Sequence, residues 1–529
     1  MTQTEHHPEA KDHEIVVEMR GIVKRFPGVV ANDHVDFNLR RGEIHALLGE
    51  NGAGKSTLMN VLAGLYQQEA GTIRVNSRLV EFSSPKDAID AGIGMVHQHF
   101  MLVPSQTVTE NILLGLDKPR FRLLLNQYDK VIAELGERFG LQIDPRAKVW
   151  QLSVGEQQRV EIIKMLYRGA QVLIMDEPTA VLAPQEIEGL FNTLRSMTAE
   201  GKSIIFISHK LQEVMEISDR VTVLRKGKVT AAGLLTKEIT RQELAHQMVG
   251  REVIFHLDKQ DKQPGEVVLA VENLHAENDK GLPALRGVSL NVRAGEIVGL
   301  AGVAGNGQRE LAQVLTGLRD CTQGKVLLKG ESINNRPARL GIRMGLAHIP
   351  EDRTHVGSAP NLSVTDNVIM KKYRKPPIAR GWMLDIPAAT QFAEELKQAY
   401  DIIVPSVETP VRLLSGGNLQ RVILAREISS EPVVMIAMQP TRGLDVGAIE
   451  GVHRLLLAQR QADSAILLVS EELEELLSLS DRIYVIYEGR IMGEVKVTSE
   501  KSEDKIIEML GLMMTGTPLE QIDGAANHV

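Results

Sequence analysis

Residues 49–56 read Gly49-Glu50-Asn51-Gly52-Ala53-Gly54-Lys55-Ser56, which fits the pattern G-x-x-x-x-G-K-[ST] of loops that bind nucleotide phosphates. An apolar run at 44–48 is predicted to form a buried strand before this loop, and residues 56–62 are predicted to open a helix after it. The glycines allow successive backbone N–H groups to converge on phosphate oxygens. Lys55 is expected to reach the β- and γ-phosphates, Ser56 to ligate Mg²⁺, and Thr57 to belong to the same nucleotide-binding set.

The same loop returns later in the chain in an altered form. Gly302 and Gly307 stand where Gly49 and Gly54 stand, but Gln308 and Arg309 replace the lysine and the serine. Other landmarks recur in the same order, and a repeat of this length indicates a duplicated domain. Short β-branched runs alternate with helical stretches in both copies, which favours an α/β fold with parallel sheets. We predict a first domain at 14–250, a linker at 251–265, a second domain at 266–514 and a C-terminal tail at 515–529.

The central part of the first copy is predicted from its apolar pattern. Residues 172–175 and 204–207 are expected to be buried strands. The stretch 98–152 is expected to be largely helical, with Val131, Leu135 and Phe139 at helical spacing as core residues.

Composition limits the possible classes of protein. The chain has 529 residues, 43% of them apolar, a formal charge of -8 and a single cysteine, Cys321. These values indicate a soluble cytosolic protein of two domains with no intramolecular disulfide and no nucleic-acid surface. No apolar run is long enough for a membrane helix, and the acidic residues 1–14 lack the apolar core of a secretory signal.

Candidate catalytic residues follow the predicted strands of the first copy. Asp176 and Glu177 end the strand at 172–175, where Asp176 is expected to hold Mg²⁺ and Glu177 to orient or deprotonate the attacking water. His209 and Gln98 follow two other strands and are expected to contact the γ-phosphate, with Gln98 also near the metal. Phe26 is interpreted either as a ring that stacks on adenine or as a core residue.

Two further stretches identify a family. Leu414-Ser415-Gly416-Gly417-Asn418-Leu419-Gln420 and, in the first copy, Leu152-Ser153-Val154-Gly155-Glu156-Gln157 resemble the signature of ATP-binding cassette (ABC) ATPases. The chain looks like the tandem-cassette ATPase of sugar- and nucleoside-type bacterial importers, and residues 305–308 and 281–285 favour its nucleoside branch. The resemblance implies two tandem P-loop domains, each with a RecA-like α/β core, a β subdomain and a helical subdomain.

The family arrangement implies which site hydrolyses ATP. In such ATPases two cassettes close head-to-tail, and each ATP lies between the phosphate loop of one and the signature of the other. The first copy keeps its loop and acidic residues, whereas the matching positions of the second copy are Gln308, Arg309, Glu351, Met438, Gln439 and Glu471. The second copy keeps the signature residues Ser415, Gly416, Gly417 and Asn418, and also Asp445, where the first copy has Val154, Glu156 and Ala183.

One hydrolytic site per chain is therefore expected, made by the loop of the first copy and the signature of the second. Two alternatives stay open for the other site. It binds ATP through backbone amides and Arg309, or it binds no nucleotide.

The resemblance also implies the partners. We expect ATP and Mg²⁺ as ligands, two membrane permease subunits, and an extracytoplasmic solute-binding protein reached through the permease. The chain is expected at the cytoplasmic face of the inner membrane as a peripheral protein, with no inserted segment and no nucleic acid. Residues 100–104 are either a permease contact or a buried loop. One chain is expected per two permease subunits, although two chains pairing is the alternative.

The solute is predicted to be a nucleoside, with a monosaccharide such as ribose as the alternative. Tandem-cassette translation factors and DNA-repair proteins are less favoured. The former carry a long charged linker and two competent sites, and the latter need zinc cysteines that one Cys321 cannot supply. A nucleotide switch with negligible turnover does not fit the intact Asp176-Glu177 pair.

Overall fold

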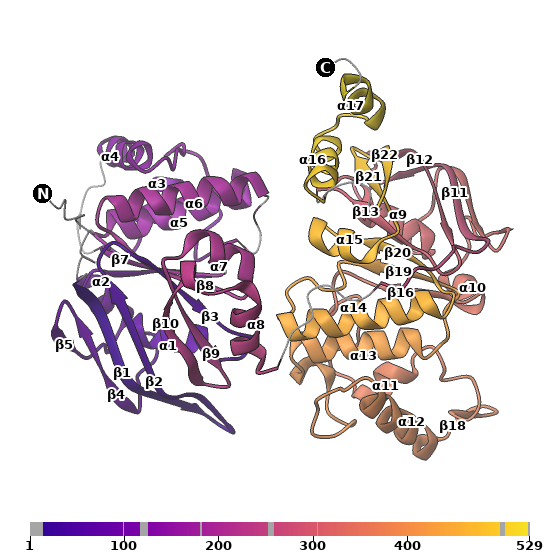
Figure 1. The fold of residues 1–529 in the computed structure, drawn as a ribbon, viewed down its shortest axis with the longest axis horizontal. Coiled ribbons are helices and arrows are strands. Elements are labelled where there is room, and N and C mark those ends of the chain that lie inside the picture. The colour runs from indigo at the N-terminus through magenta and orange to yellow at the C-terminus, as the bar shows by residue number, and fades with distance from the viewer. Residues whose placement is uncertain are drawn as a thin grey trace, which may run out of the picture. The chain divides into compact units, whose positions relative to one another are not determined.

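The computed structural model describes residues 14–98, 100–116, 125–179, 182, 184–251, 259–303, 305–497 and 503–526. The chain divides into two compact units (Figure 1). The first comprises Met1–Val253 with Asp445–Gly447, and the second comprises Ile254–Leu444 with Ala448–Val529. No described helix has the length and apolarity that crossing a membrane requires.

The first unit contains two sheets. A four-stranded antiparallel sheet has the order β2-β1-β4-β5, and a six-stranded sheet has the order β10-β9-β3-β8-β7-β6. In the second sheet β9, β3, β8, β7 and β6 run parallel, and β10 pairs antiparallel with β9 at the edge. The strands are β1 (Ile15–Phe26), β2 (Val29–Arg40), β3 (Ile44–Leu48), β4 (Ala70–Val75), β5 (Arg78–Val80), β6 (Ile93–Val96), β7 (Val172–Asp176), β8 (Ser203–Ser208), β9 (Arg220–Arg225) and β10 (Lys228–Leu235).

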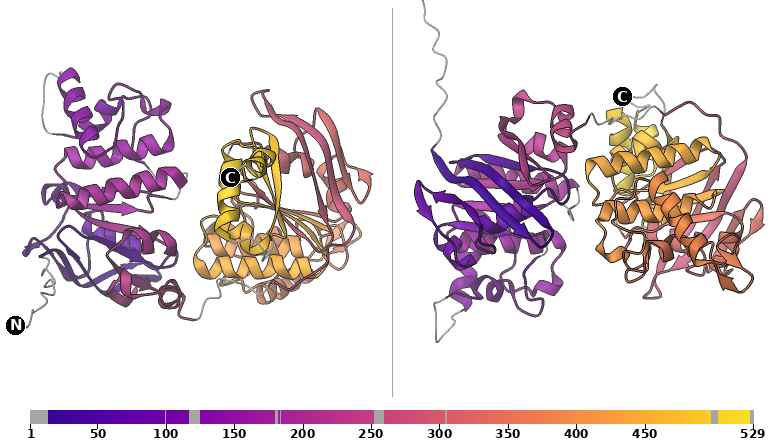
Figure 2. Two further views of the ribbon diagram at one scale, coloured as in Figure 1. Left: turned by 45° about the horizontal axis from the view of Figure 1, so that its top comes forward. Right: turned by 90° about the horizontal axis from the view of Figure 1, so that it is seen from below.

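Helices cover both faces of the parallel sheet. Helix α1 (Lys55–Leu62) contacts β1 and β2 and so lies between the two sheets, while α5 (Val154–Tyr167) and α6 (Pro184–Ala199) pack on the other face (Figures 1 and 2). One apolar core fills the space around α1 and a second lies under α5 and α6. The remaining helices are α2 (Pro85–Asp90), α3 (Val108–Leu113), α4 (Leu125–Arg138), η1 (Val149–Gln151), α7 (Leu211–Ile217), η2 (Thr236–Glu238) and α8 (Arg241–Val249).

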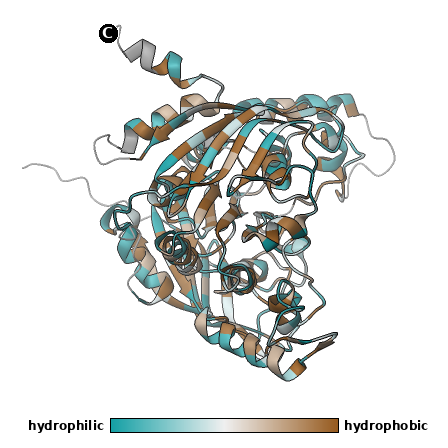
Figure 3. Ribbon diagram, turned by 90° about the vertical axis from the view of Figure 1, so that its right-hand side faces the viewer, coloured by the Kyte–Doolittle hydropathy of each residue, from teal (hydrophilic) through white to brown (hydrophobic). Residues whose placement is uncertain are grey.

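The second unit repeats this plan. Its sheets have the orders β12-β11-β14-β15 and β16-β19-β20-β13-β21-β22, which match the first unit strand for strand. The strands carry hydrophobic residues along their lengths (Figure 3). They are β11 (Val267–Glu277), β12 (Pro283–Arg293), β13 (Ile297–Ala301), β14 (Gln323–Leu328), β15 (Glu331–Ser332), β16 (Leu346–Ile349), β19 (Val434–Met438), β20 (Ala465–Val469), β21 (Arg482–Tyr487) and β22 (Arg490–Lys496).

The second unit adds a small hairpin and two C-terminal helices. The hairpin pairs β17 (Ala379–Arg380) with β18 (Met383–Leu384), and α16 (Glu503–Met514) and α17 (Leu519–Ala526) follow β22. Part of the predicted C-terminal tail is therefore helical. The other helices are α9 (Gln308–Leu315), α10 (Ala338–Arg343), α11 (Val364–Ile369), α12 (Ile386–Ala399), η3 (Val411–Leu413), α13 (Gly416–Ile428), α14 (Val446–Gln461) and α15 (Leu473–Leu479).

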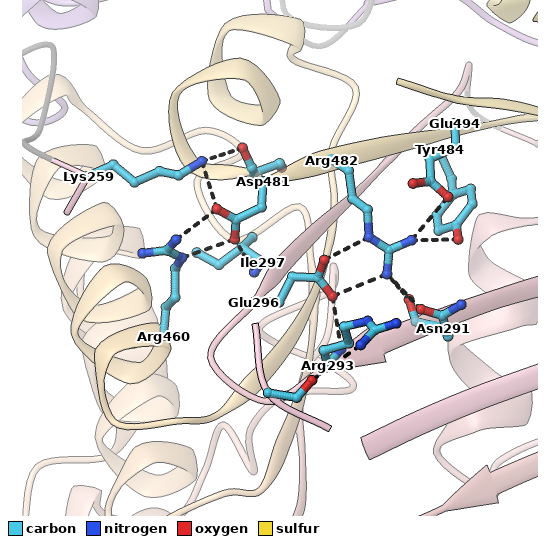
Figure 4. A network of polar contacts seen from close by, with 12 residues as sticks. Lys259, Asn291, Arg293, Glu296, Ile297, Arg460, Asp481, Arg482, Tyr484 and Glu494 are labelled. Carbon is cyan, nitrogen blue, oxygen red and sulfur yellow. Dashed lines mark hydrogen bonds and ion pairs between the residues drawn. The ribbon is translucent and has the colours of Figure 1, made fainter. Parts of the chain in front are cut away.

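Part of the predicted linker is bound to the second unit. Lys259 Nζ lies 3.0 Å from Asp481 Oδ1, and Arg460 Nη2 lies 2.8 Å from the same oxygen (Figure 4). The carboxylate of Asp481 also accepts a hydrogen bond from the N–H of Ile297 at the start of β13. This network ties residues after 258 to the sheet, whereas residues 252–258 lie outside the described part of the chain.

The expected fold class is confirmed by the sheets of the two units. The strands predicted at 44–48, 172–175 and 204–207 are confirmed as β3, β7 and β8, which are wholly buried. One core prediction is wrong. Val131 of α4 is 48% exposed, and the buried positions are Ile132, Gly136 and Phe139. Leu135, which is partly buried, packs against that core.

Candidate functional site

Glycines fix the shape of the loop between β3 and α1. Gly52 and Gly54 have φ values of +80° and +103°, a region that favours glycine. A Cβ atom on Gly54 would lie 2.2 Å from the carbonyl oxygen of Ala31 in β2. Asn32 Nδ2 donates to the carbonyl oxygen of Gly54 at 3.1 Å, so that β2 and the loop are held together. The loop therefore presents its backbone at the N-terminus of α1 in one defined form.

Lys55 is enclosed by this loop. Its ammonium donates to the carbonyl oxygens of Gly49 at 2.6 Å and Glu50 at 3.0 Å. Burial lowers the pKa of Lys55 from its ordinary value. The ammonium is thus positioned inside the loop, where phosphate oxygens are the ligands that loops of this type accept.

Ser56 and Asp176 form the polar pair expected of a metal site. The Ser56 hydroxyl donates to Asp176 Oδ1 at 3.4 Å, and burial raises the pKa of this carboxyl group. A hydroxyl beside a buried carboxylate fits Mg²⁺, which prefers oxygen ligands. Among the described residues no group of three or more His, Cys, Asp or Glu side chains is placed to hold a metal ion.

Glu177 is held at both of its carboxylate oxygens. His209 Nδ1 lies 2.8 Å from Oε1, and Gln98 Nε2 donates to Oε2 at 3.2 Å. Burial acts to raise the pKa of Glu177, but the hydrogen bond and the charge of His209 outweigh burial and lower the pKa. A carboxylate that stays ionised and faces a loop of this kind is suited to accept a proton from water.

The backbone at Glu177 is also unusual. Its φ is +48°, a region that non-glycine residues rarely adopt, and its N–H donates to the carbonyl oxygen of Ile207 at 3.0 Å. Thr179 Oγ1 donates to Glu213 Oε2 at 2.6 Å and fixes the turn that follows. The sequence analysis does not identify Asn32 or the Thr179–Glu213 pair. The second copy has Leu285 at the position of Asn32, and this difference between the copies is a signal that could have identified Asn32.

The other predicted nucleotide-binding residues lie around the loop. Asn51 and Gly52 are exposed, Glu50 and Thr57 are partly buried, and Ala53 is buried. Phe26 ends β1 and is 38% exposed, with its ring edge-on to Tyr66 at 5.4 Å between centroids. The exposure of Phe26 does not fit the core-residue interpretation.

The second unit keeps the backbone of this site but not its charges. Gly305 and Gly307 have φ values of +90° and +104°, and α9 begins immediately after Gly307. Gln308 Nε2 donates to the carbonyl oxygen of Val303 at 3.0 Å, just as Lys55 donates to Glu50. Arg309 is exposed. The position that would ligate a metal is Met438, a buried thioether side chain, which is a poor ligand for Mg²⁺.

Two of the remaining positions of the second site, Glu351 and Glu471, are acidic. Glu351 pairs with Arg442, and burial raises the pKa of Glu471. Gln439 replaces Glu177 and is a neutral amide that cannot act as a base. The second unit thus keeps the glycines of the loop but lacks the lysine, the serine hydroxyl and the two carboxylates that the first unit has at these positions.

The two signatures differ at the helix N-termini that carry them. In the second unit Ser415 is the N-cap of α13, and Ser415 and Gly416 are exposed. In the first unit Glu156 folds back on the N-cap of α5, with its carboxylate accepting from the N–H of Ser153 at 2.8 Å. An anionic side chain at this helix end offsets the positive end of the helix dipole, which is what favours a bound phosphate.

Asp445 follows the second signature in the chain and is among the described residues. Ala183, the residue that occupies its position in the first copy, lies outside the described residues.

Comparison with known protein families decides the classification. The model of the family described as "ABC transporter" matches residues 32–180 and 285–442, one region in each unit. The chain belongs to the ABC transporter family. Each matched region includes one of the two loops, at 49–56 and 302–309, and one of the two signature-like stretches, at 152–157 and 414–420.

Several ABC proteins are similar over nearly the whole chain. The guanosine import ATP-binding protein of Bacillus subtilis is 50% identical, covering 97% of this chain and 100% of that protein. The glucose import ATP-binding protein of Haloferax volcanii is 48% identical, covering 94% and 96%. The nucleoside import ATP-binding protein of Lactococcus lactis is 46% identical, covering 95% and 99%.

A solved structure shares the tandem fold. The RNase-L inhibitor matches with a TM-score of 0.62 and 19% identity over 93% of each chain. At this identity the similarity concerns the fold alone.

Proposed function

We propose that this ABC protein is the ATP-hydrolysing subunit of a bacterial importer for nucleosides. The observation that supports it most strongly is the set of contacts around Glu177, which joins His209 and Gln98 next to the Lys55 loop. Relatives that share about half of their residues with this chain are named as import ATP-binding proteins, two of them for guanosine or nucleosides.

In the proposed reaction, ATP and water yield ADP and phosphate. The backbone amides of residues 49–54 and Lys55 bind the phosphates, and Phe26 stacks on the adenine. A water oxygen attacks the γ-phosphorus, the bond to the bridging oxygen of ADP breaks, and Glu177 accepts the proton that the water loses. His209 and Gln98 hold the carboxylate in place through the bonds described above.

Ser56, Asp176 and Gln98 would hold Mg²⁺. When bound, this ion would offset the negative charge of the phosphates. The exposed Ser56 hydroxyl beside the buried Asp176 carboxylate supports this assignment.

We further propose one hydrolytic site per chain. The first unit holds the complete set of groups on the phosphate-loop side, and the second unit holds the signature residues Ser415, Gly416, Gly417 and Asn418, which Asp445 follows in the chain. These two sets would serve the same ATP when the cassettes close as in the rest of the family. The second phosphate loop lacks a base and a metal ligand, so we assign it no hydrolysis.

The chain is proposed to act at the cytoplasmic face of the membrane with two permease subunits and an extracytoplasmic solute-binding protein. Met101 and Trp150 are 66% and 64% exposed, and the N–H of Trp150 donates to the carbonyl oxygen of Pro104 at 3.1 Å. Two large apolar side chains exposed on contacting segments favour the permease-contact interpretation of residues 100–104 over a buried loop.

A second candidate solute is a monosaccharide. The 48% identical relative from Haloferax volcanii is named for glucose, and a 42% identical protein of Rubrobacter xylanophilus is named for ribose. The residues that contact a solute belong to other subunits, so the two candidates share every assignment made above.

Uptake of labelled guanosine, ribose and glucose in cells with the gene, without it, and with the Glu177→Gln variant would test the proposal. Loss of guanosine uptake in the deletion and in the variant is expected. Loss of sugar uptake alone would replace the nucleoside by a sugar, and uptake that does not change would contradict the importer assignment.

A further inference from the structure

The hairpin of β17 and β18 in the second unit exposes several large apolar side chains. Trp382 at its turn is fully exposed, Met383 is 75% exposed, and Leu384 and Ile386 are also exposed. Gly381 has a φ of +64°, which suits a two-residue hairpin turn. Figure 1 shows β18 at the edge of the second unit beside α12.

The base of the hairpin is firmly anchored, so the exposed tip is a feature of the fold. Ile378 and Ala379 are buried, and the N–H of Asp385 donates to the carbonyl oxygen of Ile378 at 2.9 Å. Asp385 also caps α12 by accepting from the N–H of Ala388 at 3.2 Å, and it pairs with Arg380 at 2.6 Å. The contacts of Asp385 thus fix the base of the hairpin, while the apolar side chains at its tip stay exposed.

Cationic side chains lie next to this tip in the chain. Residues 371–380 contain Lys371, Lys372, Arg374, Lys375 and Arg380 and no acidic residue. Lys371 and Lys372 bind groups of the second unit itself. Lys371 pairs with Glu427, and Lys372 donates to the carbonyl oxygen of Ser429. Arg374 and Lys375 are exposed.

An exposed tryptophan with flanking cations has a particular physical preference. Tryptophan favours the boundary between lipid headgroups and acyl chains, and Lys and Arg side chains are attracted to anionic headgroups. Trp382 lies with Gly381 in the turn, and Met383 follows in β18. A groove on a partner protein would have to enclose these two exposed side chains, Trp382 and Met383, whereas a lipid surface accepts them without a matching shape. Charge and shape together favour a membrane over a protein partner.

We propose that the tip of this hairpin, Trp382 and Met383, inserts into the headgroup layer of an anionic membrane while Arg374 and Lys375 bind its lipid headgroups. This contact goes beyond the proposed function, in which the permease alone holds the protein at the membrane, and it departs from the expectation that no segment inserts. It is shallow, because a two-residue tip reaches no further than the interfacial layer.

The chain offers a direct spectroscopic test because it has only two tryptophans, Trp150 and Trp382. The full-length Trp150→Phe protein is mixed with vesicles of phosphatidylglycerol and phosphatidylcholine, and with vesicles of phosphatidylcholine alone. We expect the emission of Trp382 to shift to shorter wavelength, and the protein to sediment, with the anionic vesicles only. The matched Trp382→Phe protein, which keeps Trp150, is expected to show no shift.

The charges are tested separately. Each of Arg374→Gln and Lys375→Gln is expected to weaken binding to anionic vesicles roughly fivefold, because one cation is lost from the surface each time. Both side chains are exposed, so the variants should fold, and unchanged ATPase activity of the variants verifies this.

An unshifted emission with no sedimentation would overturn the proposal. So would equal binding to neutral vesicles, or a tip that responds only when permease subunits are present, because the partner would then be a protein. None of these outcomes bears on ATP hydrolysis or uptake, so failure here is distinguishable from failure of the proposed function.

Discussion

Glu177 and Gln439 adopt the same strained backbone conformation in the two units, with φ values of +48° and +45°. Each N–H donates to the strand that follows, Glu177 to Ile207 at 3.0 Å and Gln439 to Val469 at 2.8 Å. The two side chains differ by a single functional group, a carboxylate in one and an amide in the other. The duplicated fold therefore keeps this backbone position in both units, but only the first unit carries an ionisable side chain there, the one that we propose as the catalytic base.

Loss of the loop lysine should weaken ATP binding, whereas loss of the matching glutamine in the second unit should not. Lys55→Ala removes the ammonium that the loop encloses, and we expect ATP affinity to fall at least about tenfold, because hydrogen bonds to charged groups are worth about 1.5–3 kcal/mol. The matched variant is Gln308→Ala, which removes the side chain at the same place in the second unit. It is expected to change turnover by less than about twofold. Equal losses in the two variants, measured by nucleotide binding and ATPase assays, would contradict the asymmetry.

The second signature should be sensitive to bulk at Gly416. Gly416→Val copies the residue that the first unit has at this position, Val154. The nearest atom to a new Cβ is 3.7 Å away, so the unit should fold normally. We expect turnover to fall about 10²-fold, the scale for losing a preorganised donor to a developing charge. Val154→Ala is the matched control and should leave turnover unchanged; a decrease there as large as that of Gly416→Val would refute the assignment.

Coupling to the permease should depend on Trp150. Trp150→Ala removes a side chain that is 64% exposed, so the free energy of unfolding should change little. Solute uptake in cells is expected to fall while the ATPase activity of the isolated chain persists. The measurement is the ratio of the two activities. Uptake equal to that of the original protein would show that this surface is no permease contact.

Glu427 should stabilise the second unit in a pH-dependent way. It is fully buried, with Arg426 Nε at 2.9 Å and a salt bridge to Lys371. Burial opposes ionisation, but the two cations outweigh it and lower the pKa of Glu427 below its ordinary value. The stabilisation is therefore complete above the pKa of the unfolded chain, about 4.3. It is lost as the pH falls through the lower pKa of the folded protein.

Glu427→Gln is expected to lower the free energy of unfolding of the second unit by about 3 kcal/mol at neutral pH. The difference from the original protein should shrink below about pH 4. Denaturant unfolding at several pH values measures it. Glu18→Gln, which breaks the exposed pair with Arg20, is the control and should cost less than about 1 kcal/mol. A difference for Glu427→Gln that persists unchanged at acid pH would contradict the role given to its charge.

Much of the site could be predicted because its signals are local in the sequence. The loop at 49–56 and the strands before it and before Asp176 carry their own patterns of glycines and apolar residues. The contacts of Gln98 and His209 with opposite oxygens of Glu177 could not be predicted in detail. They join three strand ends that are distant in the sequence, and only the sheet order brings them together.

The error at Val131 has a simple physical cause. The face of α4 that meets the core includes Gly136, where a Cβ atom would lie 2.9 Å from the carbonyl oxygen of Leu141. A glycine contributes nothing to an apolar pattern, so the predicted stripe was displaced by one residue from Ile132 to Val131. The hairpin at 379–384 was likewise missed, because two strands of two residues each give no periodicity to detect.

The most direct test of the central claim is the steady-state ATPase rate of the original protein, Glu177→Gln and Gln439→Asn. Asparagine tolerates the positive φ at position 439, so Gln439→Asn shortens the side chain without straining the backbone. We predict a loss of about 10²–10⁴-fold for Glu177→Gln, the scale of general base catalysis, and less than about a twofold change for Gln439→Asn. Turnover that survives in Glu177→Gln, or falls equally in both variants, would contradict a single hydrolytic site in the first unit.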